Sequence, residues 1–519
     1  MERYSRAFGE IRRICARFCE KICRFCDFGT ICRIFCDFIS APHFKRAFIC
    51  GVALYLIALF ALLCGDIYYI DDWHTSVRDI TWNHNSRYFG TFILNDLTAF
   101  GKGAVDSSPL LQIMAMILAI ISSIILLYLI RKKFDLLGVL ASLPLGLSPH
   151  FLQNLSYKFE SLFMCVALFL TIAPFLFKDN RRAFCAVSVV CLVLMFMSYQ
   201  AANATYIILS VFFAFSAYFL EGRKFKESAI FLAICAINLI IATLLYKLTI
   251  NDHYNLVEDS YALPKIIPLN SHFFVGVWAN LTTYLTTIFN DFKQMAYIWL
   301  VALIALLFVI NIAIRTNRPK ILAIFATIAF LALEIFLSYG LYLVLQKPLF
   351  YPRAFYGFSA FVAILCIANI SLANTPPHLQ KIAHYISCVV VMIMAYFLIS
   401  FANIYANALK KQSEYLDFRN SLLLKDLGEV VPKGGNTMLY IEHDVNGNHA
   451  VAQRFMDKYG EISRIIPRDF MASHFASEYN YDMDGLCLFA KGQLGSKIIL
   501  KNTYHTIEKI KSCYIVTQN

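Results

Sequence analysis

The segment that decides the fold is residues 65–90, GDIYYIDDWHTSVRDITWNHNSRYFG, which lies between two stretches apolar enough to cross a bilayer. The segment itself carries too many charges to span the membrane. Read as one helix from Asp71, it places Asp71, His74, Thr75, Arg78 and Trp82 on one face. The sequence therefore predicts an amphipathic helix beside the membrane that turns carboxylates, an arginine and an indole towards one site.

This combination of side chains suits a sugar joined to a phosphate. Carboxylates accept protons from sugar hydroxyls, arginine matches phosphate oxygens with a planar fork of donors, and an indole offers its face to a pyranose. The alternative is an interfacial helix that only caps the bundle. The residues of this segment alone leave both interpretations open.

The composition indicates a polytopic membrane protein. Of 519 residues, 59% are hydrophobic and 15% are charged, which is not typical of a soluble globular domain. The net charge of +12 comes from positive residues spread between apolar segments, so it reports membrane orientation and lipid contact and does not predict a nucleic-acid partner. No glycine-rich phosphate loop with its lysine is present, so a nucleotide sugar is not the expected donor.

The sixteen cysteines do not predict a secreted disulfide framework. Six lie between Cys15 and Cys36, and most of the others fall inside apolar runs. Residues 1–46 are expected to form a basic, Cys-rich amphipathic segment on the cytoplasmic face, where palmitoylation or packing explains the cysteines better than a metal. The first strongly apolar run begins near Ala47 and is expected to remain as a membrane helix.

The apolar runs predict about eleven membrane spans. They cover residues 47–65, 109–130, 134–150, 161–177, 183–199, 203–220, 228–247, 295–314, 321–345, 354–373 and 382–405. Alternate connections are rich in Lys and Arg, at 131–133, 178–182, 223–226 and 315–320, and the positive-inside rule places them in the cytoplasm. The N-terminus is then inside, and the loops 66–108 and 248–293 lie outside.

The last part of the chain reads as a separate small domain. Residues 406–519 include TMLYIEHDV, the helix-like AVAQRFMDKYG and a final apolar run CYIVTQ, which together predict an α/β unit. The expected architecture is a cytoplasmic segment (1–46), a multi-pass α-helical transmembrane domain (47–405) and an outer C-terminal α/β domain (406–519).

Several short motifs, taken in order, resemble one family. Asp71, Asp72, Arg78, Trp82 and Arg87 are followed by LSYKFESL from residue 155, SYQA from residue 198 and PRAFYGF from residue 352. This order resembles the serotype-converting O-antigen glucosyltransferases of the type II family, over most of the membrane region. The resemblance implies a GT-C-like glycosyltransferase of the bacterial inner membrane, with its C-terminus in the periplasm.

By the same resemblance, the donor would be a sugar, typically glucose, on undecaprenyl phosphate. The acceptor would be a surface polysaccharide such as lipopolysaccharide O-antigen, and transfer would take place on the periplasmic face. The rival from another class is a transporter or flippase of the lipid-linked sugar. A transporter would be expected to show internal repeats and charged or broken helices at the midplane, whereas the polar residues here gather in outer loops.

Asp71 and Asp72 are the predicted catalytic pair. An inverting transfer needs one carboxylate to take the proton of the acceptor hydroxyl as the lipid phosphate leaves, and either acid could serve. The alternative is that one of them caps the helix at its N-terminus. A divalent cation held by these acids remains open, and no other cofactor is expected.

The predicted ligands of the phosphate are Arg78, Arg87 and Arg353, because the leaving phosphate gains negative charge that a fixed cation stabilises. Their alternative role is snorkelling towards lipid headgroups. Arg353 lies on the outer side, where the positive-inside rule disfavours arginine.

The remaining predicted binding residues have structural alternatives of their own. They are His74, Trp82, Lys158, Glu160, Tyr199 and Gln200. Lys158 and Glu160 could simply pair with each other, Trp82 could stack on headgroups, and Tyr199 could belong to the interfacial aromatic belt. Glu334, inside an apolar run, is expected to point inward and make a structural hydrogen bond.

Overall fold

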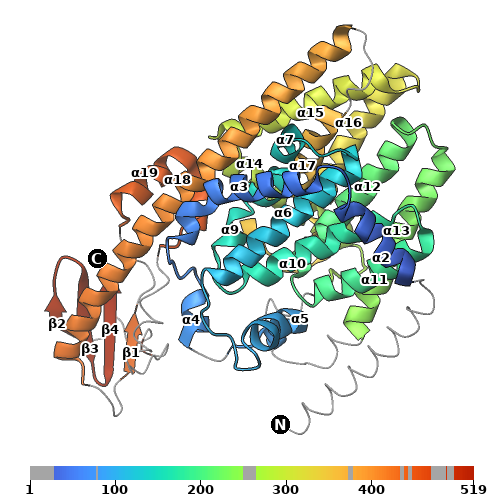
Figure 1. Ribbon diagram of the computed structural model, residues 1–519. Helices are drawn as coiled ribbons and strands as arrows, with labels where there is room; N and C mark the ends of the chain where they lie inside the picture. The colour runs from blue at the N-terminus through green and yellow to red at the C-terminus, as the bar shows by residue number, and fades with distance from the viewer. Residues whose placement is uncertain are drawn as a thin grey trace.

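The computed structural model describes residues 28–77, 80–248, 265–371, 378–432, 438–441, 447–468, 487 and 496–518. Most of these residues are helical, and a small β-sheet lies at the C-terminal end (Figure 1). The predicted phosphate ligand Arg78 and most of the Cys-rich segment, residues 1–27, lie outside the described residues.

Seven helices in the described chain are long and apolar enough to cross a membrane, which confirms a polytopic α-helical protein. They are α3 (Phe44–Leu63), α6 (Leu110–Arg131), α12 (Asn203–Phe219) with the preceding turn η4 (Gln200–Ala202), α13 (Phe225–Tyr246), α15 (Ala296–Arg315), α16 (Lys320–Leu337) and α18 (His378–Val430). Three shorter apolar helical stretches cover residues 136–147, 161–177 and 356–371. The predicted count of eleven spans stays a prediction.

The shorter elements of the membrane domain are distributed between these spans. They are α2 (Phe28–Ile39), α4 (Asp72–Val77), η1 (Trp82–Asn85), α5 (Tyr88–Thr91), η2 (Phe92–Thr98), α7 (Leu136–Ser142), α8 (Pro144–Leu147), α9 (Leu152–Ser156), α10 (Ser161–Ile172), η3 (Ala173–Phe177), α11 (Arg181–Phe196), α14 (Phe273–Phe292), η6 (Gly340–Val344), η7 (Pro352–Ala354) and α17 (Tyr356–Ser371).

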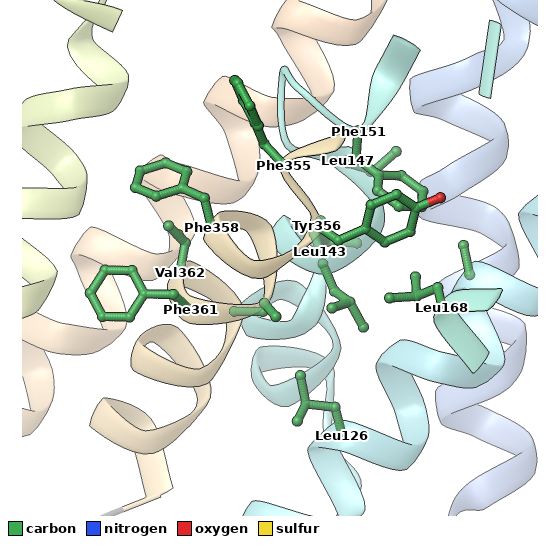
Figure 2. Close-up of a cluster of buried hydrophobic side chains, with 14 of the residues drawn as sticks. Leu126, Leu143, Leu147, Phe151, Leu168, Phe355, Tyr356, Phe358, Phe361 and Val362 are labelled. Atoms are coloured by element: carbon green, nitrogen blue, oxygen red, sulfur yellow. The ribbon is translucent and has the colours of Figure 1, made fainter. Parts of the chain in front are cut away.

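Helix α17 forms the centre of the core. It is buried on every side from Tyr356 to Ile370, as expected for a helix that is apolar all round. It packs against α12, α7, α8 and α15. Figure 2 shows its first turns against side chains of α6, α8 and α10 and against Leu143, which lies between α7 and α8, with the rings of Phe151 and Tyr356 edge-on at 5.2 Å. The turn that carries Arg353 directly precedes this core helix and is therefore held on a rigid base.

Three of the basic connections meet at one end of the bundle. The Arg318 guanidinium donates to the Arg223 carbonyl oxygen at 2.9 Å, and Arg223 and Lys178 both lie within 4 Å of the Asp179 carboxylate, at 3.8 and 3.7 Å. Helices α12 and α13 run from this end to the end where Gln200 bonds the Tyr246 hydroxyl. The basic connections therefore lie at the opposite end of the molecule from Gln200 and its neighbours.

A helix that the sequence analysis did not foresee lies inside the predicted outer loop 248–293. Helix α14 spans Phe273–Phe292 and buries one face through Leu281, Tyr284 and Ile288. The opposite face exposes Trp278 and Phe289. Thr and Asn residues interrupt the apolar pattern, so the segment reads as a loop unless its helical period is counted.

The last transmembrane helix extends far beyond the bilayer. Helix α18 has 53 residues, which corresponds to about 80 Å, whereas the hydrocarbon core of a membrane is about 30 Å thick. The predicted domain boundary between residues 405 and 406 falls inside this continuous helix. Figure 1 shows α18 crossing one side of the bundle and projecting beyond it to the β-sheet.

The C-terminal residues divide between two packing units. Strands β1 (Met438–Ile441), β2 (Lys497–Lys501), β3 (His505–Ile510) and β4 (Cys513–Gln518) form one sheet in the order β1-β4-β3-β2, in which only the β1–β4 pair is parallel. The sheet packs on the end of α18, around Leu423 and Leu427. Helix α19 (Ala450–Tyr459) and the turn η8 (Gly460–Ile465) pack instead against the membrane domain. A small C-terminal sheet is thus present, as expected, but α19 does not pack on it, and a single α/β domain over residues 406–519 stays a prediction.

One disulfide joins Cys487 and Cys513 in this C-terminal region. This pair was not predicted, because most cysteines of the chain fall in the N-terminal cluster or inside apolar runs. Cys32 and Cys36, in α2, are free and exposed. Oxidised and free cysteines therefore lie in different parts of the chain.

Candidate functional site

The Asp71–Asp72 pair lies in a turn that precedes a short helix. The prediction of one helix from Asp71 to Trp82 is wrong, because α4 ends at Val77 and Trp82 begins the separate turn η1. Asp72 is buried, and its carboxylate accepts hydrogen bonds from the backbone N–H groups of Tyr69 at 2.8 Å, Lys158 at 2.9 Å and Phe159 at 3.3 Å. Asp72 thus fastens the turn to the segment that follows α9.

The two acids therefore occupy different environments. Burial raises the pKa of Asp72, and the three N–H donors offset only part of that increase. The Asp71 side chain is exposed. Its backbone carbonyl accepts hydrogen bonds from the N–H and the hydroxyl of Thr75, and no group of the described residues bonds its carboxylate. Asp71 keeps its carboxylate available, whereas the carboxylate of Asp72 is engaged by the backbone.

Glu160 is the second carboxylate near the site. Its Oε1 accepts a hydrogen bond from the Trp82 indole nitrogen at 2.5 Å. Burial raises the pKa of Glu160; the charge of Arg87 lowers it, and that of Asp71 raises it. The Trp82 ring is buried edge-on against Phe163, at 5.7 Å between centroids. The indole thus orients Glu160, and its role as a stacking surface for sugar stays a prediction.

Arg353 is held on the site by two residues of the segment around α9. Its terminal nitrogen donates to the Tyr157 hydroxyl at 2.6 Å, and its backbone N–H donates to the Gln153 side chain at 2.8 Å. Burial lowers the pKa of Arg353, but its tyrosine neighbours and the carboxylates Glu160 and Asp71 raise it more, so the guanidinium stays charged.

Arg87 approaches the same group from the loop 66–108. Its Nε lies 3.5 Å from the Gln200 side-chain oxygen, and its guanidinium lies 4.7 Å from the centre of the Tyr199 ring. The Gln200 amide in turn donates to the Asn85 carbonyl oxygen at 3.2 Å. The Tyr199 hydroxyl is buried beside the Arg353 guanidinium, and among the described residues it makes no well-aligned hydrogen bond. The structure therefore brings together Arg87, Tyr199 and Gln200 from two distant segments.

Lys158 does not pair with Glu160, so that alternative is wrong. The Lys158 ammonium lies 2.5 Å from an oxygen of Asp66 and 3.3 Å from one of Asp106, over the face of the Tyr68 ring. Burial raises the pKa of Asp106, but hydrogen bonds from Ser108 and Tyr68, together with the Lys158 charge, lower it to about 2. Lys158 thus joins the two ends of the loop 66–108.

Two other predicted residues are less closely tied to the site. His74 is half-buried in α4, one turn after Asp71. Glu334 is buried in α16, as expected, but the predicted structural hydrogen bond is not found among the described residues, where neither carboxyl oxygen has a partner.

The donor set around Asp71 and Asp72 does not fit a divalent cation. Three backbone N–H groups point at the Asp72 carboxylate, and an N–H dipole directed at an oxygen opposes a cation there. Across the described ranges, no three His, Cys, Asp or Glu side chains lie close enough to share a metal ion. We therefore assign no step to a metal.

Comparison with known proteins identifies the family of the chain. The family profile described as glucosyl transferase GtrII matches residues 59–364. The chain belongs to the glucosyl transferase GtrII family. This confirms the resemblance seen in the loop motifs. The matched region includes every predicted site residue from Asp71 to Arg353 and leaves out the C-terminal domain.

One relative of this GtrII chain is an uncharacterised 55.3 kDa protein of Salmonella phage P22, encoded in the gtrB 5′ region. The two are 27% identical over 257 residues, which cover 47% of this chain and 51% of the phage protein. The match thus spans about half of each chain. No solved structure matches the chain.

Several residues that build the site were not foreseen. Gln153, Tyr157 and Tyr69 orient Arg353 and Asp72. The backbone carbonyl oxygen of Ile465, in the C-terminal region, accepts a hydrogen bond from the Tyr69 hydroxyl. Tyr157 belongs to the motif at residues 155–162, but nothing in that motif indicated that it binds Arg353. No sequence pattern indicated the contact between residues 69 and 465.

Proposed function

We propose that this glucosyltransferase transfers glucose from a polyprenyl phosphate, such as undecaprenyl phosphate, to a surface polysaccharide such as lipopolysaccharide O-antigen. The observation that carries the proposal is the exposed Asp71 carboxylate on the turn that Asp72 ties to the segment after α9, because Tyr157 of the same segment holds Arg353. An exposed carboxylate and a fixed guanidinium on one segment suit a reaction in which a hydroxyl loses a proton and a phosphate leaves.

In the proposed reaction, Asp71 takes the proton of the acceptor hydroxyl. The hydroxyl oxygen attacks the anomeric carbon of glucose as the bond from that carbon to the phosphate oxygen breaks. The lipid phosphate leaves with the bonding electrons and gains negative charge. Arg87 and Arg353 stabilise that charge because their guanidinium groups are held in place before the reaction begins, by Gln200 and Tyr157 respectively.

Two observations support Asp71 over Asp72 as the base. The Asp71 side chain is exposed to an incoming hydroxyl, whereas Asp72 is buried with its carboxylate directed at three backbone N–H groups. Asp72 is then a positioning residue that fixes the turn on which Asp71 stands. Arg78, outside the described residues, stays a predicted third phosphate ligand.

Sugar hydroxyls have two candidate partners near Arg87. The Tyr199 hydroxyl is buried beside Arg353 without a well-aligned hydrogen bond among the described residues, so a sugar oxygen could complete its hydrogen bonding. Gln200 carries an amide next to it. Loss of the Tyr199 hydroxyl is expected to weaken binding of the donor.

We also propose that the reaction takes place on the periplasmic face of the inner membrane. The site lies at the end of the bundle opposite to the basic connections, which the positive-inside rule assigns to the cytoplasm. The disulfide Cys487–Cys513 supports an oxidising compartment for the C-terminal domain, while Cys32 and Cys36 are free.

The test compares sugar donors on the purified full chain in liposomes. Radiolabelled polyprenyl phosphate glucose should label the added polysaccharide, and UDP-glucose should not. Label transferred from UDP-glucose alone would refute the lipid donor. Movement of the labelled lipid across the bilayer without transfer to polysaccharide would instead support the flippase that the sequence left open.

A further inference from the structure

A buried charge cluster outside the transfer site joins the C-terminal region to the membrane domain. Arg464, in η8, donates from both terminal nitrogens to the two carboxyl oxygens of Asp291, with 2.8 Å between one pair. Asp291, near the end of α14, is fully buried, and the same carboxylate accepts His150 Nε2 at 2.8 Å. A bidentate arginine–carboxylate pair fixes orientation as well as distance, so this clamp holds η8 in one place.

The residue next to the clamp contacts the catalytic turn. The Ile465 carbonyl oxygen accepts the Tyr69 hydroxyl at 2.6 Å, in a buried environment. Tyr69 in turn donates its backbone N–H to Asp72, and its ring stands edge-on to Tyr157 at 4.8 Å. Tyr157 is the partner of Arg353. One tyrosine therefore links Ile465 to both the Asp71–Asp72 turn and the arginine proposed to bind phosphate.

We propose that Arg464 is a positioning residue of the transfer site, acting through Ile465 and Tyr69 on the turn that carries Asp71. The proposal rests on the function proposed above. It gives the C-terminal region, which lies outside the part matched by the family profile, a role in setting the geometry of the reaction. Arg464 itself touches no reacting group, so its effect must pass through the Tyr69 hydroxyl.

The test is a double-mutant cycle on the full chain, with Arg464→Met, Tyr69→Phe and both together. Arg464→Met removes the clamp, and Tyr69→Phe removes only the hydroxyl that Ile465 accepts. Each variant should lower kcat about tenfold with little change in KM for the donor, because a small misplacement of the base slows the chemical step. If both act along one path, the double variant should also lose about tenfold; a loss of about 100-fold, the product, would overturn the proposal.

Arg419→Met is the control, because Arg419 is a second hydrogen-bonded arginine of the C-terminal region; its side chain is buried, whereas that of Arg464 is partly exposed. It bonds the Tyr504 carbonyl oxygen and Gln518, far along the chain from Tyr69. The loss of kcat in the double variant Arg419→Met with Tyr69→Phe should equal the product of the two single losses, because the two residues act independently. Arg464→Lys keeps the charge without the fork of donors and should restore part of kcat; no recovery above Arg464→Met would count against the clamp.

Thermal unfolding of the same variants separates this proposal from the proposed function. If the native protein transfers no glucose from the lipid donor, the reaction assigned here is wrong, but the Arg464–Tyr69 coupling can still be measured in unfolding midpoints. If the unfolding midpoint of the double variant shifts by less than the sum of the two single shifts, Arg464 and Tyr69 are coupled and the structural link is retained. If the shifts add, the link is refuted. If Arg464→Met does not fold, Asp291→Asn takes its place in the cycle.

Discussion

The contrasting environments of Asp71 and Asp72 predict that replacing Asp72 lowers the free energy of unfolding, whereas replacing Asp71 leaves it nearly unchanged. Asp72→Ala leaves three buried N–H groups, on Tyr69, Lys158 and Phe159, without an acceptor. An unsatisfied buried donor costs about 1–3 kcal/mol, so the variant should lose about 3 kcal/mol or more of unfolding free energy. Asp72→Asn keeps one acceptor oxygen and should lose less than Asp72→Ala. Asp71→Asn changes an exposed side chain and should stay within about 0.5 kcal/mol of the native protein.

Thermal unfolding of the detergent-solubilised chain checks this order, with Asp96→Asn as the control because Asp96 is an exposed acid of the same loop. The predicted midpoints fall in the order native, Asp71→Asn and Asp96→Asn together, then Asp72→Asn, then Asp72→Ala. Refutation would be an Asp72→Ala midpoint equal to that of the native protein, or an Asp71→Asn midpoint as low as that of Asp72→Ala.

Three further predictions concern other parts of the chain. The pKa of Asp106 is lowered from 3.8 to about 2, so the contribution of its carboxylate to stability is present above about pH 4 and is lost as the pH falls towards 2. Asp106→Asn should therefore make the unfolding temperature depend less on pH between about pH 4 and 2. Gly357→Ala would drive a methyl group into the Ser338 carbonyl oxygen and should cost about 1–3 kcal/mol or more, whereas Gly428→Ala, in open space on α18, should raise the midpoint slightly; equal effects would contradict this packing. Cys32 and Cys36 should react with a thiol reagent at once, while Cys487 and Cys513 should react only after reduction, as mass spectrometry can show; labelling of Cys487 without a reductant would remove the disulfide.

The membrane architecture could be predicted because long apolar runs need no distant partner to be recognised. The runs near residues 47, 109, 228 and 295 became α3, α6, α13 and α15. Helix α14 was missed because polar residues such as Asn280 and Thr282 dilute its apolar face. The length of α18 was missed because the second half of the helix is rich in polar residues. The β-sheet packs on the end of this half, around Leu423 and Leu427.

The chemistry of the site could be predicted only as far as residue types and motif order allow. Asp71, Arg87 and Arg353 were chosen because carboxylates and guanidinium groups suit a sugar phosphate. The division of roles between Asp71 and Asp72 could not be read, because the Asp72 partners Lys158 and Phe159 lie 86 and 87 residues further along the chain. The Ile465–Tyr69 contact, 396 residues apart, leaves no local pattern at all.

The most direct test of the central claim is the single-turnover rate of glucose transfer from polyprenyl phosphate glucose by Asp71→Asn, beside the native protein and Asp96→Asn. Loss of a general base lowers such a rate by about 10²–10⁴-fold. We predict a loss of that size for Asp71→Asn, an unchanged unfolding midpoint, and a native rate for Asp96→Asn. Transfer by Asp71→Asn at the native rate would show that another group removes the proton and would contradict the account.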